Sequence, residues 1–255
     1  MYMQNHLKDK VALVTGSSRG IGAAIAQSLA RNGAKVVLHG RDVAALFSMQ
    51  TRIEGEGGIA MVVLGDVTKF DEIEAMRSKI EQTFGSIDIL VANAGGSYTM
   101  PAPIEDIPVD GWHASVEGNL TATFLTIKSF LPGMKKRKSG SILTLSSSAA
   151  RMANAQAPIP YSAAKAGVQM LTQSVAAQAG PFGIRVNCLA PATILTERNQ
   201  QRIPDAQKIK LVDHHPIRRL GTPEDVAQAA LFLLSDNAAW ITGVILDVAG
   251  GVVMC

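Results

Sequence analysis

Val14-Thr-Gly16-Ser-Ser-Arg-Gly20-Ile-Gly22 lies between an apolar run, Val11-Ala-Leu-Val14, and an amphipathic segment that ends at Asn32-Gly33. This order predicts a buried strand, a glycine-rich turn and a helix over residues 20–32. The three glycines allow a tight turn and let a pyrophosphate approach the backbone at the helix N-terminus. A glycine-rich turn alone can be a simple loop, but its position between a strand and a helix favours a dinucleotide site.

Apolar runs typical of buried strands recur along the chain, and segments with helical spacing separate them. Seven strands are predicted, over residues 11–14, 35–38, 61–64, 87–91, 141–145, 185–189 and 243–248. Continuous apolar runs are typical of parallel strands that helices cover on both faces. No linker or repeat divides the 255 residues. We therefore expect an α/β fold, a single doubly wound Rossmann-type domain spanning residues 1–255.

The stretch 192–221 differs from the rest of the chain because it is long, polar and poor in strand signals. Such segments in compact domains are more often functional than simple connections, so we expect a lid over the substrate. Its apolar residues predict a mixed, mostly apolar pocket beneath the lid: Ile194, Leu195, Ile203 and Leu211.

Composition argues against several classes of function. The formal net charge is +3 and charged residues make up 18% of the chain, so there is no general electrostatic case for binding nucleic acid or a membrane. The basic run Lys135–Lys138 follows a helical pattern and is interpreted as a solvated helix end. No run approaches 18 apolar residues, and Met1–Lys10 lacks a signal-peptide pattern. We expect a soluble, cytoplasmic protein.

Neither a disulfide nor a metal site is predicted. Cys188 and Cys255 lie far apart, and Cys188 is interpreted as a buried thiol because its neighbours are apolar. His214 and His215 have no further His, Cys or carboxylate at ligand spacing.

Tyr161 and Lys165 are four residues apart, which places both side chains on one face of a helix. A nearby ammonium favours the phenolate, so the tyrosine could exchange a proton at moderate pH and act as a general acid/base. The pair alone is a weak signal, because this spacing is common on helix surfaces that have no catalytic role.

Ordered motifs along almost the whole chain strengthen that signal. After Thr15-Gly16-x3-Gly20-x-Gly22 come Asp66-Val67, Asn93-Ala94-Gly95, Asn119, Ser146–Ser148, Tyr161-x3-Lys165, Arg185-Val-Asn187 with Pro191, and Gly243. In this set and order the sequence resembles the short-chain dehydrogenase/reductase family. The resemblance implies hydride transfer between a nicotinamide and a carbonyl or secondary alcohol.

The same resemblance implies roles for individual residues. Tyr161 would be the general acid/base, Lys165 would bias it and hold the nicotinamide ribose, and Asn119 would support a water that links Lys165 to solvent. A serine, Ser147 or Ser148, would polarise the substrate oxygen. The implied cofactor-binding residues are Gly16, Ser18, Arg19, Gly20, Ile21, Gly22, Arg41, Asp66, Val67, Asn93, Ala94, Gly95, Tyr161, Lys165, Pro191, Ile194 and Thr196.

The choice of serine depends on where one extra residue is accommodated. In the family the catalytic serine usually stands seven residues after the glycine that opens the strand, and counting from Gly140 gives Ser147. It also usually stands thirteen residues before the tyrosine, and counting back from Tyr161 gives Ser148. A buried strand tolerates an insertion poorly, whereas the loop 151–160 tolerates it easily. This favours Ser147 without excluding Ser148.

The residues after the second strand bear on the choice of cofactor. Relatives that prefer NAD usually have an aspartate where this chain has Gly40, so no carboxylate there repels a 2′-phosphate. Arg41 follows, and Arg19 stands in the glycine turn; two guanidiniums can converge on one phosphate. We therefore expect NADP(H) over NAD(H).

Two other functions remain as alternatives. One is a catalytically silent dinucleotide sensor or partner subunit, although none of the expected tyrosine, lysine and serine is missing. The other is an epimerase or dehydratase of the wider family, which the chain length and motif spelling disfavour. The resemblance also implies a small-molecule substrate and a homodimer or homotetramer, and the substrate's identity is left open.

Overall fold

The computed structural model of this chain describes residues 7–254. The strands are β1 (Val11–Thr15), β2 (Lys35–Gly40), β3 (Ile59–Leu64), β4 (Ile89–Ala92), β5 (Gly140–Leu145), β6 (Ile184–Pro191) and β7 (Ile245–Val248). The α-helices are α1 (Gly20–Arg31), α2 (Val43–Gly55), α3 (Phe70–Phe84), α4 (Val109–Val116), α5 (Ala122–Arg137), α6 (Ile159–Ala179), α7 (Glu197–Arg202), α8 (Asp205–His214) and α9 (Pro223–Leu234).

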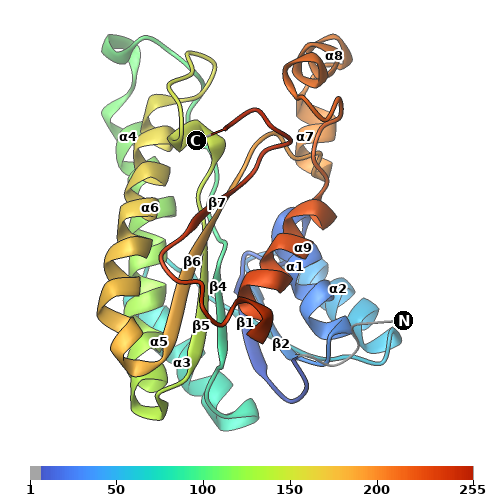
Figure 1. Cartoon of the computed structure of the whole chain (residues 1–255), viewed down its shortest axis with the longest axis vertical. Coiled ribbons are helices and arrows are strands. Elements are labelled where there is room, and N and C mark those ends of the chain that lie inside the picture. The colour runs from blue at the N-terminus through green and yellow to red at the C-terminus, as the bar shows by residue number, and fades with distance from the viewer. Residues whose placement is uncertain (1–6, 255) are drawn as a thin grey trace.

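The strands form one parallel sheet in the order β3-β2-β1-β4-β5-β6-β7. Helices α1, α2 and α9 cover one face of the sheet, and α3, α5 and α6 cover the other (Figure 1). The strand order reverses beside β1, where crossovers leave to opposite sides and a crevice opens at the carboxyl edge. The predicted doubly wound, Rossmann-type α/β fold with seven parallel strands is confirmed.

Each face of the sheet has its own apolar core because every strand is buried on both sides. Ile25 and Leu29 of α1 pack in one core with Leu46 of α2, and Ile73 and Ile80 of α3 pack in the other. Helix α1 ends at Arg31, one residue before the predicted end. Cys188 is a fully buried free thiol, as its apolar neighbours predicted.

Several strand boundaries differ from the prediction by one or two residues, and the last strand shows the physical reason. It begins at Ile245 and not at Gly243. Gly243 has a φ of 76°, and the backbone N–H of Val244 donates to Oδ1 of Asn187 at 3.1 Å. A left-handed residue and a hydrogen bond to a side chain interrupt the ladder here, and an apolar run cannot reveal either feature.

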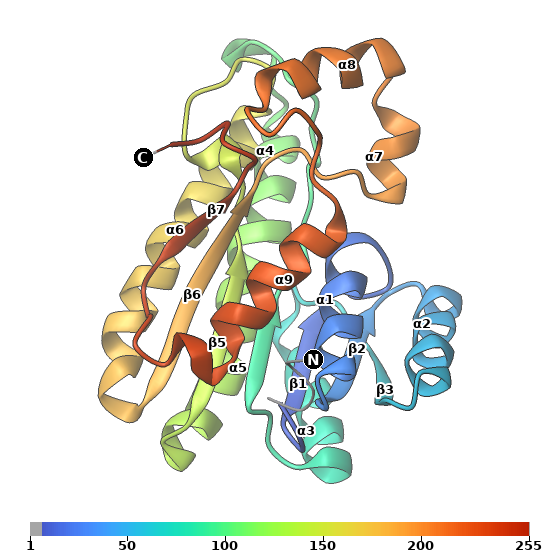
Figure 2. The same cartoon turned by 45° about the vertical axis from the view of Figure 1, so that its right-hand side comes forward.

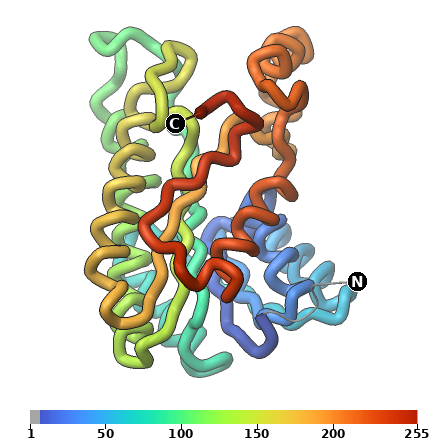
Figure 3. The backbone as a smooth tube through the Cα atoms, in the orientation of Figure 1, coloured from blue at the N-terminus to red at the C-terminus, as the bar shows by residue number. Residues whose placement is uncertain are grey.

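The segment 192–221 leaves the carboxyl end of β6 and carries the short helices α7 and α8, which project beyond the sheet (Figure 2). Its two ends are joined: the N–H of Leu195 donates to Gly221 O at 2.8 Å, and the N–H of Gly221 donates to Thr193 O at 3.1 Å. The intervening chain is therefore an excursion closed at its base. The C-terminal segment returns to the same edge of the sheet (Figure 3).

Two sequence-based expectations concern residues at the ends of the chain. The absence of a signal pattern in Met1–Lys10 and the role of Cys255 fall wholly or partly outside the described residues. Within residues 7–254, no helix combines the length and the apolar composition needed to cross a membrane.

Candidate active site

The glycine turn between β1 and α1 forms a cradle with no room for side chains. Gly16 and Gly20 have φ values of 66° and 58°, and a Cβ on Gly22 would lie 2.3 Å from Gly16 O. The Asn93 amide holds the turn by donating to Thr15 O at 2.8 Å and to Gly16 O at 3.1 Å. No side chain caps the N-terminus of α1, so its backbone N–H groups face the cradle. This arrangement fits the pyrophosphate of a dinucleotide.

Two adjoining cavities flank the cradle. The outer cavity, about 500 Å³, lies between the glycine turn and the ends of β2 and β3; the inner cavity, about 370 Å³, extends to the end of β5 and the start of the segment 192–221. Every predicted cofactor-binding residue lines at least one of them. The outer cavity contains Gly16, Ser18, Arg19, Arg41, Asp66, Val67, Ala94 and Gly95. The inner one contains Gly16, Arg19, Gly20, Ile21, Gly22, Asn93, Ala94, Gly95, Tyr161, Lys165, Pro191, Ile194 and Thr196.

Tyr161 and Lys165 lie one turn apart near the start of α6, and both line the inner cavity. Lys165 is 4% exposed, and burial lowers the pKa of its ammonium to about 8. Its Nζ donates to Leu145 O at 2.7 Å and lies 5.8 Å from the centre of the Tyr161 ring. Most of the ammonium is therefore still charged at neutral pH.

The pKa of Tyr161 moves opposite to the direction that the spacing suggested. Burial raises the pKa of the phenol above its ordinary value, although a hydrogen bond with Ser147 opposes the shift. The expected lowering of this pKa by Lys165 is wrong, because desolvation of the phenolate is the largest influence and the Lys165 Nζ lies 5.8 Å from the ring centre. A protonated Tyr161 suits a general acid.

Ser147 and Ser148 are placed differently at the end of β5. Ser147 lines the inner cavity with Tyr161 and acts to lower the pKa of that phenol, whereas Ser148 opens a 3₁₀ turn and does not line the inner cavity. The pairing of β5 with β6 runs without a bulge from Gly140 to Leu145. This register agrees with an extra residue that lies in the loop after the strand.

Asn119 is fully buried in a π-helical turn (Glu117–Thr121) between α4 and α5. Its amide donates to Gly96 O at 2.9 Å and to Ser115 O at 2.8 Å, and its Oδ1 accepts from Gly96 N at 3.1 Å. One donor thus holds the loop after β4, and the other bonds to the end of α4. The side chain lines neither cavity, and only one lone pair of Oδ1 is left for a water.

Two residues near the outer cavity were missed by the sequence reasoning. His39 is 2% exposed; its Nδ1 accepts from Gly16 N at 3.4 Å and its Nε2 donates to Gly65 O at 3.0 Å. Burial lowers the pKa of His39 to about 4, so the neutral ring joins the glycine turn to the loop before Asp66. Asp42 forms an ion pair with Arg19. The position of His39 at the end of a strand was its only signal in the sequence.

A third cavity, which we call the substrate-side cavity, has a volume of about 490 Å³ and shares Ser147 and Tyr161 with the inner cavity. The pocket is mixed, as expected, but polar and apolar groups line it almost equally. Ile203 and Leu211 line this cavity, but Ile194 lines the inner one and Leu195 lines none of the three. Long polar side chains provide much of the wall: Asn154, Gln156, Arg198, Asn199, Arg202 and Gln207. They come from loops and from α7 and α8, which carry no apolar periodicity.

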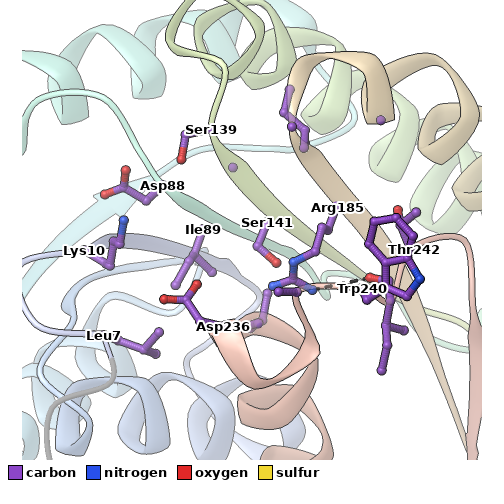
Figure 4. A pocket seen from close by; sticks show the side chains of 17 residues that line it. Leu7, Lys10, Asp88, Ile89, Ser139, Ser141, Arg185, Asp236, Trp240 and Thr242 are labelled. Atoms are coloured by element: carbon purple, nitrogen blue, oxygen red, sulfur yellow. Dashed lines mark hydrogen bonds between the residues drawn. The ribbon is translucent and has the colours of Figure 1, made fainter.

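A cavity of about 510 Å³ lies where the strands begin, at the opposite edge of the sheet (Figure 4). Arg185 lines this cavity. Its guanidinium donates to Leu233 O at 2.5 Å and to Ser235 O at 3.0 Å, so this side chain holds the end of α9. This cavity contains none of the predicted catalytic residues. Within residues 7–254, no group of three or more His, Cys, Asp or Glu side chains is placed to hold a metal ion.

Known proteins match this chain over almost its whole length. Residues 16–253 match the family model described as enoyl-(acyl carrier protein) reductase. The chain is 39% identical to 3-oxoacyl-(acyl-carrier-protein) reductase of Vibrio cholerae, covering 98% of this chain and 99% of the relative. It is 37% identical to 2-(S)-hydroxypropyl-CoM dehydrogenase 3 of Xanthobacter autotrophicus, covering 98% of each.

A solved structure agrees over the same length. A 7α-hydroxysteroid dehydrogenase complexed with NADH and 7-oxo glycochenodeoxycholic acid superimposes with a TM-score of 0.91, at 38% identity over 96% of this chain and 94% of that one. The matches span the glycine cradle, the sheet and α6. The chain therefore belongs to the short-chain dehydrogenase/reductase family, whose members are oxidoreductases that bind NAD(H) or NADP(H) and interconvert alcohols and ketones.

Proposed function

We propose that this protein is an NADP(H)-dependent carbonyl reductase, or secondary-alcohol dehydrogenase, in which Tyr161 is the general acid/base and Ser147 polarises the substrate oxygen. The observation that carries the proposal is that Tyr161 and Ser147 both line the inner cavity and the substrate-side cavity, where these two cavities adjoin. An oxygen held there is within reach of both hydroxyls. Ser148 is the less favoured serine because it lines only the substrate-side cavity.

The nicotinamide, when bound, supplies or accepts the hydride. In the direction of reduction, the Tyr161 hydroxyl donates its proton to the substrate oxygen, and burial keeps that hydroxyl protonated until it is needed. The Ser147 hydroxyl donates a hydrogen bond to the same oxygen and stabilises the negative charge that develops on it. The Lys165 ammonium stabilises the phenolate left on Tyr161, and Asn119 fixes the loop that closes the inner cavity.

NADP(H) is the proposed cofactor because the outer cavity presents Arg41 and no carboxylate at Gly40. Arg19 can contribute a second guanidinium only if a phosphate competes with Asp42 for it. When no phosphate is bound, Asp42 neutralises Arg19. The relative cited above with NADH bound shows that the family also uses the other cofactor.

We further propose a single domain in which the segment 192–221 covers the substrate. Hydrogen bonds at Leu195 and Gly221 join the base of this segment, and residues of α7 and α8 line the substrate-side cavity. A cytoplasmic location and a homodimer or homotetramer remain part of the proposal. The proposed assembly rests on the family resemblance, and gel filtration would test it.

The decisive experiment is a screen of NADPH oxidation, followed at 340 nm, across ketones of different classes. The variant Tyr161→Phe should lose at least roughly a hundredfold in kcat on any ketone that is turned over while still binding NADPH, because only the proton donor is removed. Ser162→Ala, on the next residue of the same helix, is the matched control. Tight NADPH binding without turnover of any class would contradict the proposal and favour a sensor.

A further inference from the structure

Among residues 7–254, the substrate-side cavity carries two positive charges and no negative one. Arg198 and Arg202 line it, and none of its described lining residues is an aspartate or glutamate. The other long polar side chains in its wall are neutral amides. A concave site with charge of one sign attracts ligands of the opposite sign, and both arginines are exposed and so accessible to such a ligand.

Both guanidiniums project from one face of α7, because residues four apart on a helix lie one above the other. Arg198 reaches across to the loop after β4: its Nη1 would lie 3.5 Å from a Cβ on Gly96. Arg202 places Nη2 2.6 Å from Sδ of Met100. A thioether sulfur is a weak acceptor and carries no charge, so it does not neutralise the guanidinium.

Neither charge has a carboxylate partner among residues 7–254. Glu197 is next to Arg198 in sequence, but it faces the glycine turn, with Oε2 3.9 Å from a Cβ on Gly20, and lines only the inner cavity. Asp205 forms an ion pair with Lys208 at 2.9 Å. Arginine side chains elsewhere in the fold, such as Arg151 and Arg219, do form ion pairs with aspartates.

We infer that the substrate is an anion: a ketone or secondary alcohol that also carries a carboxylate, sulfonate or phosphate group. Arg198 and Arg202 bind that group while the oxygen to be reduced lies at Tyr161 and Ser147. Guanidinium is suited to all three groups because its planar N–H donors match pairs of anionic oxygens. The inference rests on the proposed function, because Tyr161 sets where the ketone lies.

Arg198 also lines the inner cavity, so it could bind the pyrophosphate of the cofactor instead. Arg202 separates these possibilities because it lines only the substrate-side cavity. If the substrate is an anion, replacing Arg202 should weaken substrate binding and leave NADPH binding unchanged.

The test compares anionic ketones with neutral counterparts at low ionic strength. The pairs are 4-oxopentanoate and its methyl ester, 2-oxopropanesulfonate and butanone, and dihydroxyacetone phosphate and dihydroxyacetone. We expect kcat/KM to favour the anion by roughly tenfold or more in at least one pair, which identifies the anionic group. Arg202→Gln should remove most of that preference by raising KM for the anion, with KM for NADPH and the constants for the neutral ketone unchanged.

Lys210→Gln is the matched control, because it removes one positive charge from α8 at a residue that lines none of the described cavities. The inference would be overturned if Lys210→Gln lost as much anion preference as Arg202→Gln. The preference would then come from the general positive charge of the lid and not from a specific contact with Arg202. Equal turnover of anion and neutral partner in all three pairs would also overturn it. So would an Arg202→Gln defect confined to NADPH.

Binding separates this inference from the proposed function. Calorimetric titration of the NADPH-saturated protein with the three anions should show binding that Arg202→Gln weakens roughly tenfold. Binding of this kind without turnover would contradict the proposed reaction while supporting the anionic ligand. Turnover of neutral ketones with no binding of any anion would support the proposed reaction and refute the inference that the substrate is an anion.

Discussion

Gly22 tests whether the cradle depends on close backbone contact. The variant Gly22→Ala places a Cβ 2.3 Å from Gly16 O and 2.5 Å from Nδ2 of Asn93, well inside the 3.4 Å at which ordinary contact begins. The turn must therefore move by about 1 Å, which overpacked sites resist at a cost of about 1–3 kcal/mol. The movement also disturbs the two hydrogen bonds that Asn93 donates, worth about 1 kcal/mol each. We expect a loss of about 2–5 kcal/mol in the free energy of unfolding.

Urea denaturation measures this loss, and NADPH titration should show affinity weakened by roughly tenfold or more, because the same turn binds the pyrophosphate. Gly133→Ala is the matched control. Its Cβ would find Arg137 Nη1 at 3.6 Å as the nearest atom, and an alanine inside α5 should stabilise the protein by about 0.5–1 kcal/mol. Equal stability of the two variants, or normal NADPH affinity in Gly22→Ala, would refute the reasoning.

The remaining predictions concern the serine, the cofactor and the buried lysine. Ser147→Ala should lose at least tenfold more kcat than Ser148→Ala with any ketone, and the reverse order would identify Ser148 as catalytic. Gly40→Asp fits sterically, since its Cβ would lie 3.6 Å from Leu46, and should raise KM for NADPH by roughly tenfold while sparing NADH; unchanged preference would contradict the phosphate site. The pKa of Lys165 is about 8 in the folded protein, below its ordinary value of 10.5. Between pH 8 and 10.5 the unfolded chain therefore binds one more proton than the folded protein, and the free energy of unfolding increases as the pH rises. Lys165→Met lacks this gain: its stability relative to the wild type should fall by up to about 1.4 kcal/mol per pH unit above pH 8, whereas a constant difference would exclude the shift.

The sequence predicted most of the fold because its signals are local. Continuous apolar runs mark strands buried on both faces, and Asn32-Gly33 marks the end of α1, so the number of strands and their crossovers could be inferred without coordinates. Boundaries were less certain where a contact between distant residues ends a strand. The N–H of Val244, which donates to Asn187, is such a case.

Within the candidate site, the sequence by itself determined which residues come together: every predicted cofactor-binding residue lines the inner or outer cavity, because the motifs lie at the carboxyl ends of neighbouring parallel strands. Only the tertiary structure decided their electrostatic state. The pKa of Tyr161 is raised because burial is a property of the folded chain, and spacing along one helix does not contain it. The positive charge of the substrate-side cavity is likewise a property of the folded chain. Arg198 and Arg202 line the same cavity as Tyr161 only because of how α7 is placed, and the nearby Glu197 faces the glycine turn.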